Sequence, residues 1–137
     1  MSAPAPRARL LYDRDCGFCR WALGWVLRWD RAGRLEPIAL QDPRAAALLA
    51  PMSDERMLES WHLVAEDGSV ASAGAAAAPL LRMLPGGAPL AALAERAPGA
   101  VERAYRLISG HRSDLGPRLT RGAVSRADRR IAERQAR

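Results

Sequence analysis

Lysine is absent from this chain of 137 residues, so all of its 21 basic side chains are arginines. We interpret this bias as genomic base composition rather than function. Aromatic residues are also scarce, at 5%, although apolar residues make up 49% of the chain. The core must therefore be built from Leu, Val, Ile and Ala, with four Trp supplying most of the aromatic bulk. The length indicates one domain that is large enough to bury a hydrophobic core without disulfide or metal cross-links.

Negative charge is scarce towards the C-terminal end. Residues 118–137 hold seven arginines against Asp128 and Glu133, so they carry +5 of the formal net charge of +6. The preceding residues are nearly neutral, which argues against a nucleic-acid-binding body because phosphate recognition needs a basic stripe on the folded surface. We expect residues 124–137 to form a solvated, weakly amphipathic helix. Binding to anionic lipid, RNA or an acidic partner is the alternative.

Long apolar runs are missing too. No stretch approaches the length of a membrane span, and residues 1–9 contain Pro and Arg but no apolar signal segment. These absences predict a cytoplasmic protein without a membrane span. The chain has only two cysteines, and structural disulfides rarely persist in the cytoplasm. The C-x-x-C spacing of Cys16 and Cys19 therefore indicates a redox-active or metal-binding pair.

The apolar pattern predicts alternating strands and helices. Gly33 is a stop signal for the first helix, and Asp42 is a candidate N-cap for the second. Residues 51–56 are expected to form a polar connector, and Asp67-Gly68 marks a β-hairpin. The expected strands are residues 8–13, 34–40, 60–65 and 69–72, and the expected helices are residues 18–29, 43–49, 75–84, 89–96, 101–109 and 124–137.

This order, β-α-β-α-β-β-α, predicts the α/β class. A parallel βαβ unit followed by an antiparallel hairpin and a covering helix gives a small mixed sheet flanked by helices. That is the thioredoxin-like layout, here with extra C-terminal helices. We divide the chain into a disordered lead-in at residues 1–7, a thioredoxin-like domain at residues 8–117 and an Arg-rich tail at residues 118–137.

The two cysteines lie between the first strand and the first helix. A thiolate rather than a thiol attacks a disulfide, and the free N–H groups at a helix N-terminus favour the anion. We therefore assign Cys16, at the start of the helix, as the nucleophile. Cys19 lies one turn further and deeper, and would resolve the mixed disulfide. The predicted activity is thiol-disulfide exchange on a protein or small-thiol substrate, without a cofactor.

Three alternatives remain for this pair. The cysteines could be inert core thiols, although their spacing and position argue against it. They could hold structural zinc, but such a site needs four ligands, and His62 and His111 are not paired in the sequence. They could also form a non-catalytic redox switch or partner-binding module. Solvent access to the Cys16 sulfur separates catalytic exchange from this last alternative, because exchange needs an open sulfur.

The segment Tyr12-Asp13-Arg14-Asp15-Cys16-Gly17-Phe18-Cys19 resembles the signature of the DCC family of predicted thiol-disulfide oxidoreductases, Asp-x-x-Cys-x-x-Cys. The resemblance runs over about residues 8–118 and implies a thioredoxin-like fold and a redox activity with no defined substrate. Arg14 stands where many members carry Gly. Residues 58–60 contain no proline, whereas thioredoxins place a cis-proline before the third strand, which puts thioredoxin-style docking of a polypeptide in doubt.

Asp13 matches the first position of that signature and ends the first strand. It could accept the Cys19 proton during resolution, as the buried acid of thioredoxins does. The alternative, a turn residue bonded to backbone N–H groups, is slightly favoured. Asp15 is expected to be a solvent-facing turn residue whose charge disfavours a thiolate at Cys16.

For four other large side chains we expect a structural role rather than a functional one. Trp21, Trp25 and Trp29 share one helix face, and we expect them to pack in the core rather than line a docking groove. We expect His62 to face solvent or to be satisfied by hydrogen bonds.

Overall fold

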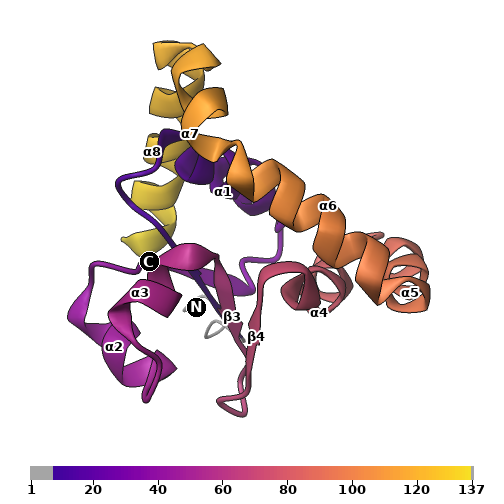
Figure 1. The fold of residues 1–137 in the computed structure, drawn as a ribbon. Coiled ribbons are helices and arrows are strands. Elements are labelled where there is room, and N and C mark those ends of the chain that lie inside the picture. Colours follow the sequence, from indigo (N-terminus) through magenta and orange to yellow (C-terminus); the bar gives the residue numbers. More distant parts are fainter. Residues whose placement is uncertain (1–7, 137) are drawn as a thin grey trace.

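The fold is a four-stranded mixed sheet flanked by helices, as the computed structural model of residues 8–136 shows (Figure 1). The strands are β1 (Ala8–Tyr12), β2 (Leu35–Ala39), β3 (His62–Val64) and β4 (Val70–Ser72), in the order β2-β1-β3-β4. β1 and β2 are parallel, and the other two pairs are antiparallel. The predicted thioredoxin-like fold is confirmed. The expected lead-in at residues 1–7 lies outside the described residues.

Eight α-helices and two 3₁₀ turns surround the sheet in the described part of the chain. They are α1 (Gly17–Trp29), α2 (Pro43–Leu49), α3 (Asp54–Glu59), η1 (Ala73–Ala76), α4 (Ala77–Met83), α5 (Ala88–Arg96), α6 (Pro98–Gly110), α7 (Arg112–Leu115), η2 (Gly116–Arg118) and α8 (Arg121–Gln135). Not one of these helices has the length and apolar character needed to cross a membrane.

Helices cover both faces of the sheet because successive strand residues point to opposite sides. Leu10 of β1 belongs to a cluster with residues of α1, α4 and α8, whereas its neighbour Leu11 belongs to a second cluster with residues of α2 and α3. Both leucines are almost completely buried. The strands therefore read as continuous apolar runs, and the expected two-sided covering is confirmed.

The predicted connector at residues 51–56 is wrong, because α3 begins inside it. The Ser53 hydroxyl caps this helix by accepting the N–H of Arg56 at 3.3 Å, and Asp54 and Glu55 follow in the first turn, where carboxylates favour helix formation. Met57 anchors the helix in the core. The segment is polar because it is a surface helix with a single buried anchor.

The prediction that the tryptophans of α1 pack in the core is wrong for two of them. Trp25 is 54% exposed and Trp29 is 37% exposed. Leu23 and Leu27 occupy the buried face instead. A close helix contact explains the difference, since a Cβ added at Gly24 would lie 2.6 Å from the Cβ of Ala127 in α8. The small residues let the two helices approach, and the large rings stay outside.

The basic C-terminal segment is helical as predicted, but one face of it is buried rather than solvated. Ala127 and Ile131 of α8 pack into the structure. Near the end of α8, Arg134 donates to Asp30 Oδ2 at 2.6 Å and to the carbonyls of Leu27, Asp30 and Leu35. Asp30 is fully buried and also accepts the N–H groups of Arg34 and Leu35. The division of the chain at residue 118 stays a prediction.

This buried pair generates a first prediction. Replacing Arg134 with methionine leaves the Asp30 carboxylate buried without its cation, so we expect the free energy of unfolding to fall by about 3 kcal/mol. Urea denaturation of the two proteins measures the change. The control is Arg129→Met, an exposed arginine of the same helix, which should cost less than about 0.5 kcal/mol. If both variants lost the same free energy of unfolding, the stabilising role of the Arg134–Asp30 pair would be contradicted.

Candidate functional site

Cys16 and Cys19 meet at the N-terminus of α1. Cys16 is the N-cap residue, with extended backbone (φ −99°, ψ 112°), and its Sγ accepts the backbone N–H of Cys19 at 3.2 Å. The Cys19 thiol donates to Cys16 Sγ at a sulfur–sulfur distance of 2.6 Å. Both thiols are free, and both residues are half-buried. The sequence spacing therefore brings the sulfurs into contact, with the Cys16 sulfur in the capping position.

The turn before the cysteines is organised by Asp13. Its backbone carbonyl accepts the N–H of Cys16 at 3.3 Å, and its side-chain Oδ1 accepts the N–H of Asp15 at 3.0 Å. Local bonding of a carboxylate to the N–H two residues on is the usual turn-forming role of aspartate. The capping role weighed for Asp13 in the sequence is thus present in the structure, and Asp15 is exposed as expected.

Gln41, in the turn that follows the neighbouring strand β2, holds this turn in place, and sequence reasoning missed it. Its Nε2 donates to Asp13 Oδ1 at 2.8 Å, and its Oε1 accepts the N–H of Arg14 at 3.1 Å. The parallel register pairs Tyr12 with Ala39, so the ends of β1 and β2 lie side by side. The signal was available, since the parallel pairing places the residues after both strands at one edge of the sheet.

A small cavity of about 210 Å³ opens beside Cys19. Its walls are mostly apolar and come from β1, the turn after it, α1, the segment just before β3, α6 and α7. They are Leu10, Tyr12, Asp13, Phe18, Cys19, Ala22, Leu23, Ser60, Trp61, Tyr105, Ile108, Ser109 and Arg112. Cys16 is not among them, so the two thiols face different surroundings. Asp13 and Cys19 both line this cavity.

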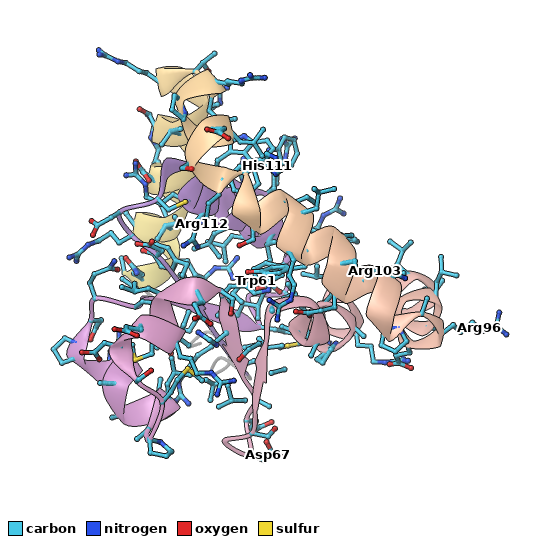
Figure 2. The ribbon with its side chains drawn as sticks, viewed as in Figure 1. Trp61, Asp67, Arg96, Arg103, His111 and Arg112 are labelled. Atoms are coloured by element: carbon cyan, nitrogen blue, oxygen red, sulfur yellow. The ribbon has the colours of Figure 1, made fainter. Side chains whose placement is uncertain are left out.

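Tyr105 and Arg112 close the cavity from the α6–α7 side. The Tyr105 hydroxyl accepts the backbone N–H of Trp61 at 3.0 Å, and the two rings stack with centroids 5.7 Å apart. Arg112 donates to the carbonyl of Leu58 at 3.0 Å. Figure 2 shows Trp61 and Arg112 on the side of the sheet that α6 crosses. The backbone N–H just before β3 is therefore already bonded within the chain.

Burial sets the chemistry of Cys19. It raises the pKa of this thiol to about 12, helped by the hydrogen bond to Cys16 and by the charge that a Cys16 thiolate would carry. Asp13 raises it slightly further, and the Arg112 guanidinium opposes the shift. Cys19 is therefore a thiol, and not a thiolate, at neutral pH.

The two histidines lie elsewhere. His62 is buried and bonded at both ring nitrogens, to Ser72 Oγ at 2.7 Å and to the carbonyl of Met57 at 2.9 Å. We expected His62 either to face solvent or to have its hydrogen bonds satisfied, and the structure shows the second. Burial lowers the pKa of His62. His111 is exposed. Within residues 8–136, no three side chains of His, Cys, Asp or Glu gather as a metal site would require.

Comparison with known proteins identifies the redox class of this chain. The family model for DCC1-like thiol-disulfide oxidoreductase matches residues 10–118, which include both cysteines and Asp13. The comparisons with curated proteins and with solved structures found no match. The match covers most of the chain and extends from β1 through η2.

The raised pKa of Cys19 generates a second prediction. In a Cys16→Ser variant at pH 8, we expect iodoacetamide to label Cys19 on the order of 100-fold more slowly in the folded protein than in urea, because only the thiolate reacts. Mass spectrometry over time measures the two rates. The Cys19→Ser variant, which retains the half-buried Cys16, serves as the reference for an accessible thiol. A folded rate for Cys19 close to the unfolded one would overturn this prediction.

Proposed function

Because the chain belongs to the DCC1-like thiol-disulfide oxidoreductase family, we propose that it exchanges dithiols and disulfides through Cys16 and Cys19. The observation that carries the proposal is the contact of the two sulfurs at the N-cap of α1, where Cys16 Sγ accepts a backbone N–H. This position supports an anionic sulfur through N–H groups and the helix dipole. Cys16 is accordingly the nucleophile.

In the first step, the Cys16 thiolate attacks one sulfur of a substrate disulfide. A bond forms between Cys16 Sγ and that sulfur, the substrate S–S bond breaks, and the other substrate sulfur leaves as a thiolate. In the second step, Cys19 attacks Cys16 Sγ, which releases the second substrate thiolate and leaves a Cys16–Cys19 disulfide. The substrate is reduced by two electrons and the pair is oxidised by two, and the reverse sequence oxidises a dithiol.

The second step needs a proton acceptor because Cys19 is a thiol at neutral pH. We assign this role to Asp13, which lines the same cavity as Cys19 and lies close enough to act electrostatically on its thiol. Its Oδ1 is held by the Asp15 N–H and by Gln41, which keeps the carboxylate in place. The turn-forming role and the proton-accepting role are compatible, since the hydrogen bonds of the turn engage Oδ1 and, in the described part of the chain, none engages Oδ2.

The exposure of Cys16 and the hydrogen bonding beside β3 both bear on the class of substrate. A protein or small-thiol disulfide can reach the half-exposed Cys16, which favours exchange over the alternative of a non-catalytic redox switch. Tyr105 already occupies the N–H of Trp61, which argues against backbone docking of a polypeptide beside β3 in the thioredoxin manner. The cytoplasmic location expected from the sequence stays a prediction.

The test is a redox titration of the purified protein in glutathione or dithiothreitol buffers, followed by mass after alkylation. We expect one reversible two-electron transition that disappears in both Cys16→Ser and Cys19→Ser. The Cys19→Ser variant should also accumulate a mixed disulfide at Cys16, because the resolving thiol is missing. Thiols that react only after unfolding would refute the proposal.

The role of Asp13 generates a separate prediction. Asp13→Asn keeps an oxygen that can accept the Asp15 N–H but removes the base, so we expect the resolution step to slow about 100-fold at pH 7. The formation of the mixed disulfide should change less than about threefold. Stopped-flow measurement of both steps with a chromogenic disulfide separates them. Gln41→Ala is the companion variant, since it loosens the turn and retains the carboxylate; if it slows resolution as much, Asp13 acts only through the turn.

A further inference from the structure

A groove between α1 and α8 combines exposed tryptophan with arginine. It is lined by Trp21, Gly24, Trp25, Arg28, Ala123, Arg126, Ala127 and Arg130. The two helices run in the same direction here, because Gly24 contacts Ala127 and, further along both helices, Leu27 bonds to Arg134. We infer that this groove, the Trp–Arg groove, docks the protein on an anionic lipid surface.

The charge of the groove is of one sign. Arg28, Arg126 and Arg130 are exposed, and within the described part of the chain no carboxylate pairs with them or lines the groove. The exposed carboxylate of α8, Glu133, lies outside the lining residues. The acidic neighbour that does face α1, Asp128, is neutralised by Arg20 at 3.2 Å. The groove is therefore complementary to a negatively charged surface.

The tryptophans supply the apolar half of such an interface. Trp25 and Trp29 lie four residues apart, so they occupy one side of α1, and both are exposed. The indole N–H of Trp29 donates to the carbonyl of Pro85 at 2.8 Å, so this ring has no polar group left to hydrate. Tryptophan beside arginine is the composition that favours the headgroup zone of a bilayer.

The geometry favours lipid over nucleic acid as the occupant. The Arg28 guanidinium lies 5.2 Å from the centre of the Trp25 ring and covers one face of it. A ring covered in this way is a poor platform for base stacking, on which single-strand binding depends. Trp25 nevertheless remains more than half exposed, so its ring can enter the headgroup layer while Arg28 stays close to the phosphates.

The same helix links the groove to the cysteine pair. Cys16 caps α1, and the helix is 13 residues long, so the pair lies within about 20 Å of the docked end. Docking would therefore hold the thiols near the membrane surface without covering the N-terminus of α1. The inference does not rest on the redox function, because neither cysteine is among the residues that line the groove.

The experiment measures binding of the full chain to lipid vesicles by cosedimentation. We expect binding to vesicles that contain equal parts of phosphatidylglycerol and phosphatidylcholine, and none to phosphatidylcholine alone, at 0.1 M salt. Each arginine at a membrane surface contributes about fivefold, so the double variant Arg126→Gln with Arg130→Gln should bind about 25-fold more weakly. Trp25→Ala should also weaken binding, because it removes the apolar contact.

A matched control removes the same charge elsewhere. Arg96→Gln combined with Arg103→Gln changes the net charge equally. Figure 2 shows Arg96 at the far end of α5 and Arg103 on α6, away from the groove, and both residues are exposed. This variant should bind within about twofold of the original protein, and so should Cys16→Ser. Failure to bind anionic vesicles overturns the inference, as does an equal loss in the control. Binding to single-stranded DNA but not to vesicles would assign the groove to nucleic acid instead.

Discussion

The buried carboxylate of Asp30 holds together the three elements that position the cysteine pair. It follows the last residue of α1, accepts the N–H groups at the start of β2 and receives the Arg134 guanidinium from α8. A buried charge is tolerated only when partners satisfy it, and here backbone and side chain do so together. The end of α1 is thereby tied to the sheet and to α8, and its N-terminus with Cys16 stays at the edge of the sheet beside β1.

The two cysteines differ in their chemical surroundings, although they lie one helix turn apart. Cys16 Sγ caps the helix and accepts a backbone N–H. Cys19 lines a mostly apolar cavity, where burial disfavours its thiolate and so raises the pKa of its thiol. One helix turn thus separates a sulfur that accepts a backbone N–H from a thiol whose pKa is raised by burial. Asp13 and Gln41, from the ends of two parallel strands, hold the turn that creates this difference.

Most of the fold could be predicted because its signals are local. Alternating apolar runs, the Asp42 cap and the Asp67-Gly68 turn were sufficient to place the strands and most helices. The error at the tryptophans has a tertiary cause. Trp25 and Trp29 lie on the apolar-looking face of α1, but the contact of Gly24 with α8 selects the leucine face for burial. Periodicity predicts that a helix has a buried face, whereas the partner helix decides which face it is.

By itself, the sequence determined the order of the strands along the chain, the meeting of Cys16 with Cys19 and the place of both at a helix N-terminus. The strand patterns are local, and spacing within one helix turn fixes the contact of the cysteines. Only the tertiary structure decided that Gln41 braces the Asp13 turn, that Tyr105 occupies the Trp61 N–H and that the basic C-terminal helix packs through Arg134. These pairs lie 28, 44 and, for Arg134 and Asp30, 104 residues apart in the chain. Contacts of that range depend on how helices and strands pack, and no local pattern encodes them.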